Sequence, residues 1–226
     1  MMERVKLDQN KVKGRFIYHF FKRTLDIVAS ACALIILSPL FLVLAILIRH
    51  EDGGPAFYLQ ERIGKDGKLF KMYKFRSMIV NADQLVDQLE DQNEIDGAMF
   101  KIKDDPRITK IGHTIRKYSL DELPQLWNVL IGDMSLVGPR PPLPTEVEEY
   151  TDYDLQRLSV TPGCTGLWQV TKRNDADFDE MVELDLDYIN HSGFFYDLGI
   201  IFRTIGVMIH PNGAYFCIAL LYHFRR

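Results

Sequence analysis

One uninterrupted apolar run near the N-terminus constrains this chain more than any other feature. The 22 residues from Ile27 to Ile48 carry no charge, and as an α-helix they would extend about 33 Å, the thickness of a bilayer core. A secretory signal would have a shorter apolar region followed by a small-residue cleavage site, whereas Arg49, His50 and Glu51 follow here. A buried helix of a soluble protein is a further alternative, but no polar face recurs along the run. The run therefore predicts a helix that inserts into a membrane.

The charges around this run, and a proline inside it, predict that the helix bends and returns to the side from which it entered. The basic residues before the run are Lys11, Lys13, Arg15, Lys22 and Arg23. Because positive flanks stay in the cytoplasm, this end is expected to be cytoplasmic. Pro39 removes a backbone donor and kinks a helix, and the Ser38 hydroxyl can satisfy the freed carbonyl. We expect a re-entrant helix broken at Ser38-Pro39; a bitopic span with a harmless kink is the alternative.

The composition narrows the class of protein. A mean hydropathy of −0.09 excludes a polytopic membrane protein, whereas 47% hydrophobic residues are enough for a packed core. The net charge of −4 argues against a nucleic-acid partner. The three cysteines form neither a CxxC pair nor a disulfide framework, so a reducing compartment is expected. The sequence also contains no P-loop, GxGxxG, HExxH or GxSxG motif.

Beyond residue 50 the pattern predicts an α/β domain that is mostly helical. Residues 56–62 and 68–76 alternate in polarity about a Gly64–Gly67 turn, which predicts a β-hairpin. Helices are expected over residues 81–96, 119–131, 145–158 and 176–190, with Gly132-Asp133 ending the second. Residues 194–209 are strongly apolar, and they fit an interfacial amphipathic helix and a core helix equally well.

Two adjacent carboxylates, Asp121 and Glu122, support two interpretations. Ser119 followed three residues later by Glu122 matches a capping box, and composition alone favours that interpretation. Three arginines accompany the pair along the chain: Arg116, Arg140 and Arg173. Carboxylates among guanidinium groups also suit phosphate chemistry, because one carboxylate can bind Mg²⁺ while another attacks phosphorus, and arginines bind phosphate oxygens bidentately.

Several long motifs occur in a fixed order along the chain. They are KFRSM at 74–78, SLDELPQLWNVLIGDMSLVGPRP at 119–141, TPGCTGLWQV at 161–170 with Arg173-Asn174 after it, and NGAY at 212–215. Together they resemble the bacterial sugar transferases, the monotopic phosphoglycosyl transferases that act on undecaprenyl phosphate. The resemblance runs from about Phe21 to Tyr215, nearly the whole chain. It implies a re-entrant membrane helix, broken at Ser38-Pro39, that carries a small cytoplasmic α/β domain with interfacial amphipathic helices.

The resemblance also implies boundaries and a place in the cell. The expected segments are a basic N-terminal segment at 1–24, the re-entrant helix at 25–49, a catalytic domain at 50–215 and an extension at 216–226. The protein is expected among the lipids of the bacterial inner membrane, at its cytoplasmic face, as a near-minimal catalytic unit without an N-terminal membrane bundle. The extension is expected to dock on the membrane, to pair two copies as a homodimer, or to be specific to a strain.

A two-step transfer is the activity that the resemblance implies. Asp121 would attack the sugar-bearing phosphate of a UDP-sugar and expel UMP, and the sugar 1-phosphate would then pass to undecaprenyl phosphate. Glu122 is carried over as the ligand of Mg²⁺. The implied phosphate, nucleotide or further site residues are Lys74, Arg116, Arg140, Arg173 and Asp197. Downstream glycosyltransferases would take the product into exopolysaccharide, capsule or lipopolysaccharide.

The sugar and an alternative function stay open at this point. The closing NGAY motif is similar to galactose- and glucose-phosphate transferases, which favours those two sugars over an N-acetylated one. Thr161 and Lys172 depart from the family pattern near the presumed sugar end. The alternative function is a non-enzymatic membrane-anchored interaction protein, in which Asp121 and Glu122 cap a helix and the basic hairpin binds anionic lipid.

Overall fold

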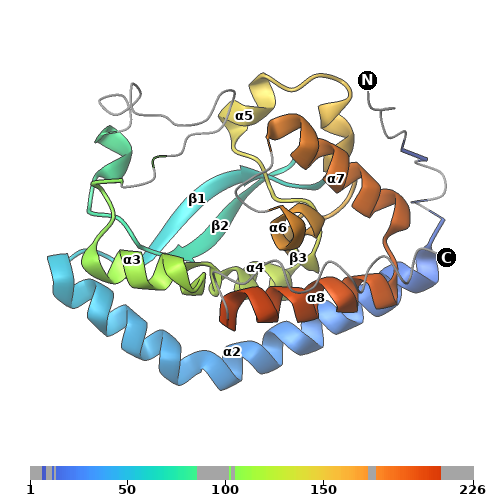
Figure 1. The fold of residues 1–226 in the computed structure, drawn as a ribbon. Helices are drawn as coiled ribbons and strands as arrows, with labels where there is room; N and C mark the ends of the chain where they lie inside the picture. The colour runs from blue at the N-terminus through green and yellow to red at the C-terminus, as the bar shows by residue number, and fades with distance from the viewer. Residues whose placement is uncertain are drawn as a thin grey trace.

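A long bent helix, α2 (Phe16–Asp52), organises the fold. The computed structural model describes residues 7–8, 12, 14–85, 102, 105–172 and 177–209. Within that part of the chain, α2 alone is long and apolar enough to cross a membrane. The helix forms a shallow V, and the other elements lie on its concave side (Figure 1).

Pro39 lies inside α2, and its local chemistry agrees with the expected break. Proline has no N–H to donate to the carbonyl of Ile35 four residues back. The Ser38 hydroxyl donates to that carbonyl at 2.8 Å instead, as expected from the sequence. The helix therefore bends without leaving a backbone acceptor unsatisfied in an apolar environment.

Two small sheets support the domain. Strands β1 (Phe57–Ile63) and β2 (Leu69–Phe75) pair antiparallel, from Phe57 opposite Phe75 to Ile63 opposite Leu69, which confirms the predicted hairpin. Strands β3 (Ser135–Val137) and β4 (Gly163–Thr165) pair in parallel, and the sequence pattern did not reveal them. At this second pair the backbones approach closely, because a Cβ on Gly163 would lie 2.0 Å from the Gly138 nitrogen.

Two of the helices predicted from the sequence are each divided into shorter elements in the structure. The described α-helices after α2 are α3 (Lys110–Lys117), α4 (Gln125–Ile131), α5 (Pro144–Glu148), α6 (Leu167–Thr171), α7 (Phe178–His191) and α8 (Phe194–Ile209). The single helix predicted over 119–131 is wrong, because a 3₁₀ turn (Leu120–Glu122) and Pro124 precede α4. The helix predicted over 145–158 is likewise two pieces, α5 and a 3₁₀ segment (Asp154–Ser159). Only the start of 81–96 lies within the described residues, as a 3₁₀ turn (Ala82–Leu85).

The N-terminal half of α2 is held to the domain by its polar residues. Arg15 donates to the carbonyl of Asn190 (2.6 Å), in the last turn of α7, and to that of Ser192 (2.9 Å), directly after the helix. Arg23 donates to the carbonyls of Val129 and Leu130 in the last turn of α4, at 2.6 and 2.9 Å. Cations at helix C-termini satisfy orphan carbonyls and the helix dipole. These basic residues, expected from the sequence to act as topology signals, therefore bind the folded domain.

The C-terminal half of α2 is held to the same domain. Leu44 and Ile48 are buried against Phe75 of β2 and Ile115 of α3. The Glu51 carboxylate accepts the first N–H groups of α3, with 2.8 Å to the Lys110 nitrogen. Asp52 forms an ion pair with Arg76 after β2. Both ends of the bent helix are thus fixed to one folded unit.

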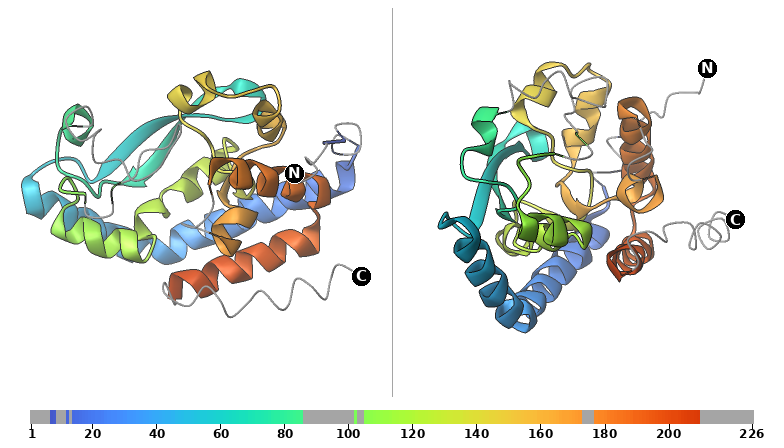
Figure 2. Two further views of the ribbon diagram at one scale, coloured as in Figure 1. Left: turned by 45° about the horizontal axis from the view of Figure 1, so that its top comes forward. Right: turned by 60° about the vertical axis from the view of Figure 1, so that its left-hand side comes forward.

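Apolar side chains cover the outer side of α2 and α8. The most exposed large apolar residues are Phe16, Ile17, Phe20, Ile35 and Ile36 on α2, and Phe195 and Phe202 on α8. On α8, Asp197 and Ile200 are buried whereas Phe195 and Phe202 are 83% and 70% exposed, so this helix is amphipathic and not a core helix. Helices α2 and α8 lie on the same side of the molecule (Figure 2), which favours the interfacial interpretation of residues 194–209.

A candidate active site at the Asp121-Glu122 dyad

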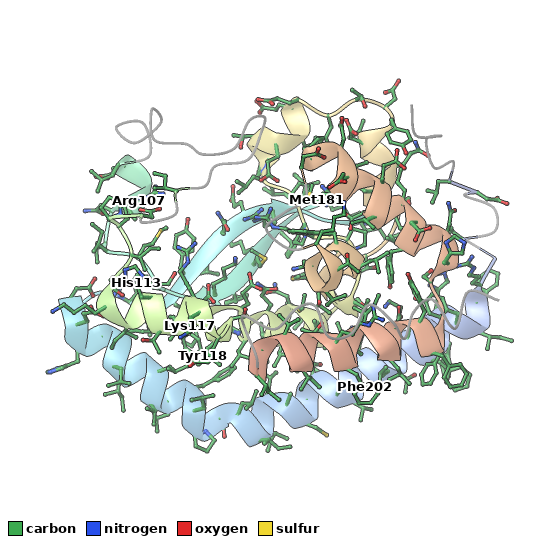
Figure 3. All side chains as sticks on the ribbon, viewed as in Figure 1. Arg107, His113, Lys117, Tyr118, Met181 and Phe202 are labelled. Carbon is green, nitrogen blue, oxygen red and sulfur yellow. The ribbon has the colours of Figure 1, made fainter. Side chains whose placement is uncertain are left out.

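The dyad lies in a tight turn between α3 and α4. Ser119 has φ 55° and ψ 26°, a left-handed conformation that costs free energy in any residue except glycine. Lys117 and Tyr118, at the end of α3, lead directly into this turn (Figure 3). The Ser119 side chain makes no capping hydrogen bond, and the Glu122 carboxylate instead accepts from the Lys74 ammonium at 3.3 Å. The capping-box interpretation is therefore wrong, and Asp121 and Glu122 are not used to cap this turn.

Electrostatics link the dyad to two of the predicted cations. Burial and the adjacent Glu122 charge together raise the pKa of Asp121 to about 6, although Lys74 and Arg116 act in the opposite direction. Lys74 comes from β2 and Arg116 from the last turn of α3. The fold thus brings together four of the predicted site residues: Asp121, Glu122, Lys74 and Arg116.

Arg140 reaches the same neighbourhood from the loop after β3. Burial lowers the pKa of Arg62 to about 10, and the Arg140 charge lowers it too, while Glu146 and Glu122 oppose this. Arg140 and Glu122 therefore act on the same buried guanidinium. Arg62 also donates to the Pro141 carbonyl at 3.0 Å, so it binds the loop that carries Arg140.

Arg157 is a second arginine that builds this loop, and sequence reasoning missed it. It is 2% exposed and donates to the Arg140 carbonyl at 3.1 Å and to the Tyr150 hydroxyl at 2.7 Å. It also forms an ion pair with Asp185 of α7, and both side chains are 1% exposed. A lone arginine near the apolar residues Leu155 and Leu158 carried no signal, because two of its partners, Arg140 and Asp185, lie 17 and 28 residues away in the chain.

Asp197, the last of the described site residues, lies where α2, α7 and α8 meet. It is 3% exposed and accepts hydrogen bonds from Lys22 at 2.7 Å, Tyr18 at 2.9 Å and Tyr188 at 2.8 Å. These contacts use its carboxylate to join α2, α7 and α8. In the structure, Asp197 thus anchors the long helix to the domain. Arg173, the NGAY motif and the 216–226 extension lie outside the described residues.

The donor set of the dyad fits a magnesium ion that is shared with a substrate. Mg²⁺ usually binds one or two carboxylates and completes its shell with water and phosphate oxygens. Asp121 and Glu122 supply two adjacent carboxylates that repel each other, and the Glu122 side chain is 39% exposed. In the described part of the chain, no three or more His, Cys, Asp or Glu side chains are grouped so that they could hold a metal ion by themselves. A protein-only cage is therefore not formed there, whereas a site completed by phosphate suits these groups.

Comparisons with known proteins give the family and the relatives of this chain. The family model described as bacterial sugar transferase matches residues 17–211. The galactosyl transferase CpsE of Streptococcus agalactiae is 50% identical over 194 residues, which cover 85% of this chain and 43% of CpsE. The undecaprenyl-phosphate galactose phosphotransferase of Salmonella typhimurium is 47% identical over 219 residues, 95% of this chain and 45% of that protein. The exopolysaccharide production protein ExoY of Rhizobium meliloti is 41% identical over 198 residues, covering 86% and 88%. The chain thus spans less than half of the first two relatives and most of the third.

Proposed function

The chain belongs to the bacterial sugar transferase family, and on that premise we propose that it transfers sugar 1-phosphate from a UDP-sugar to undecaprenyl phosphate. The observation that carries the proposal is the strained turn that places Asp121 and Glu122 beside Lys74 and Arg116. Galactose is the favoured sugar, because two relatives are named for galactose transfer. The product would enter the assembly of an extracellular polysaccharide.

In the first step, Asp121 is the nucleophile. One carboxylate oxygen attacks the phosphorus that bears the sugar, a new P–O bond forms, and the bond from this phosphorus to the bridging oxygen breaks. The electron pair of the broken bond stays on that oxygen, which leaves as part of UMP. The raised pKa of Asp121 reflects a poorly solvated carboxylate, and such an oxygen is a stronger nucleophile than a fully hydrated one.

In the second step, a phosphate oxygen of undecaprenyl phosphate attacks the same phosphorus. The P–O bond to Asp121 breaks, the carboxylate is restored, and the product is a lipid-linked diphosphate sugar. Splitting the transfer in this way means that the two large anionic substrates do not have to be bound together. Lys74, Arg116 and Arg140 offset the negative charge of each phosphate. A magnesium ion held by Glu122 would screen the phosphate oxygens in both steps.

Release of UMP tests this proposal. Purified protein with Mg²⁺ and undecaprenyl phosphate should release UMP from UDP-galactose faster than from UDP-glucose or their N-acetylated counterparts. Without the acceptor, UMP release should stop at an amount equal to the enzyme, because the first step does not need the lipid. Release that depends entirely on the acceptor would contradict the covalent step. If no UDP-sugar gives UMP release, the protein would instead be a non-enzymatic membrane-anchored protein.

The position of α2 supports a re-entrant topology. Residues near both ends, Arg15 and Glu51 among them, bind the same folded domain. In a bitopic span these ends would lie on opposite sides of a bilayer core about 30 Å thick. We therefore place both ends of α2, and the domain, at the cytoplasmic face, with the bend inside the membrane and α8 at the interface.

Labelling of single cysteines tests the topology. Gly14→Cys and Pro55→Cys, each in a variant without native cysteines, place exposed thiols before and after α2. In intact bacteria, a membrane-impermeant maleimide should label neither position, and both should react after lysis. Labelling of residue 55 in intact cells would indicate a bitopic span and contradict the proposal.

A further inference from the structure

The membrane helix holds the base of the segment that carries Arg140. The Asp26 carboxylate, on the domain-facing side of α2, accepts the Leu136 N–H at 2.9 Å. One turn earlier, the Lys22 ammonium donates to the Val137 carbonyl at 2.8 Å. Asp26 is 4% exposed and directly precedes the apolar run. A buried carboxylate beside an apolar membrane segment costs free energy unless it accepts hydrogen bonds. Its donor, the Leu136 N–H, therefore indicates which part of the domain Asp26 holds.

Every residue from Leu136 to Pro142 is then bonded through its backbone. The Gly138 N–H donates to the Thr165 carbonyl, and the Gly163 N–H donates to the Pro139 carbonyl, both at 2.8 Å. Arg157 binds the carbonyl of Arg140 and Arg62 that of Pro141. The Ile63 N–H donates to the Pro142 carbonyl at 2.9 Å. This segment, 136–142, is therefore a stiff arm whose base is on α2 and whose outer part carries Arg140.

We propose that Asp26 is a positioning residue for the transfer reaction, which sets the place of Arg140 through the 136–142 arm. The inference rests on the proposed function, in which Arg140 binds a phosphate. Asp26 touches no substrate; it acts because a shift at Leu136 is passed along a bonded segment to Arg140, four residues on. The membrane helix is then part of the site's supporting structure as well as an anchor.

Three single variants test this role. Asp26→Leu removes the acceptor, Asp26→Asn keeps an acceptor oxygen, and Ser30→Ala is the control. Ser30 is buried one turn further along, and among the described residues its hydroxyl donates only to carbonyls of its own helix. We expect Asp26→Leu to lower kcat/KM for the UDP-sugar by about tenfold to a hundredfold, since misplacement by about 1 Å can cost that much. Asp26→Asn should recover most of the loss, and Ser30→Ala should match the wild type.

A double variant separates positioning from general damage to the fold. If Asp26 acts through Arg140, Asp26→Leu should add little to the loss already caused by Arg140→Ala, because the two residues share one effect. Losses in kcat/KM that multiply would overturn the proposal. So would an Asp26→Leu protein with wild-type kinetics.

Hydrogen exchange gives a readout that does not depend on activity. In Asp26→Leu, amides of the 136–142 arm should exchange about tenfold faster or more, because a charge-assisted hydrogen bond is lost at its base. Exchange in α7 should be unchanged, which shows that the domain is still folded. An arm with unchanged exchange would overturn the positioning role. A wild-type protein that releases no UMP would instead overturn the proposed function, whatever the exchange result.

Discussion

Asp121→Asn should abolish sugar-phosphate transfer and leave a protein that is at least as stable as the wild type at neutral pH. Asparagine has the shape of aspartate but lacks the anionic oxygen that attacks phosphorus. Loss of a covalent nucleophile lowers turnover by roughly a thousandfold or more. Both the UMP released without acceptor and the lipid-linked product should disappear. Near-normal turnover in this variant would contradict the assignment of the nucleophile.

The expected stability of Asp121→Asn follows from the raised pKa of Asp121. Burial and the Glu122 charge raise that pKa from 3.8 to about 6, so ionisation is harder in the folded protein than in the unfolded chain. The ionised carboxylate therefore destabilises the fold above pH 6, and this cost disappears as the pH falls below about 4, where both states are protonated. Asparagine removes the cost at pH 7, which sets an upper limit of about 3 kcal/mol on the gain.

Denaturation in metal-free detergent solution checks this expectation. The variant should unfold at higher denaturant concentration than the wild type at pH 7, and the difference should vanish near pH 4. Asp152→Asn is the matched control, because this exposed carboxylate lies in a turn and its removal should change neither stability nor turnover. An Asp121→Asn protein that is inactive and also strongly destabilised would indicate a structural role for this carboxylate.

The sequence predicts the elements whose cause is local. The apolar run and Pro39 predict a bent helix, and the alternation about Gly64–Gly67 predicts the hairpin, because each signal depends on neighbouring residues. The capping-box motif at Ser119 predicts a cap that is not formed. The tertiary fold holds Ser119 in a left-handed conformation and turns Glu122 toward Lys74, 48 residues away. Local pattern cannot anticipate a conformation that distant contacts impose.

The same limit applies to the charges that flank the long apolar helix. Sequence reasoning takes Lys22 and Arg23 as topology signals, which depends only on their sign. In the structure Lys22 binds Asp197, 175 residues away, and Arg23 binds carbonyls at the end of α4, which is 106 and 107 residues away. The motifs, through their fixed order along the chain, predict Asp121 and Glu122 as site residues. The residues that hold the Arg140 loop can be recognised only in the folded structure.

Breaking the buried ion pair of Arg157 and Asp185 should cause the largest loss of stability in the domain. Arg157→Met leaves a carboxylate that is 1% exposed without its cation, and it also removes the donor to the Arg140 carbonyl. Loss of one member of a buried pair costs about 3–5 kcal/mol, a large part of the 5–15 kcal/mol that a typical domain has. The exposed pair Lys172–Glu180 is the matched control, and Lys172→Met should cost less than about 1 kcal/mol.

The double variant Arg157→Met/Asp185→Leu should recover much of that stability. The pair is imperfectly satisfied, since Arg157 Nε and Asp185 Oδ1 are buried and have no hydrogen-bond partner among the residues that the structure describes. Apolar replacements of similar volume therefore remove two desolvation costs together.

The loss of stability in Arg157→Met should depend on pH. Burial already raises the pKa of Asp185, so in this variant the orphaned carboxylate should take up a proton as the pH falls, and the loss of stability should shrink from pH 8 to pH 5. Losses in the two single variants that simply add, at every pH, would show that the two side chains are not coupled. If stability returns in the double variant but transfer does not, the guanidinium of Arg157 is needed to hold the loop that presents Arg140.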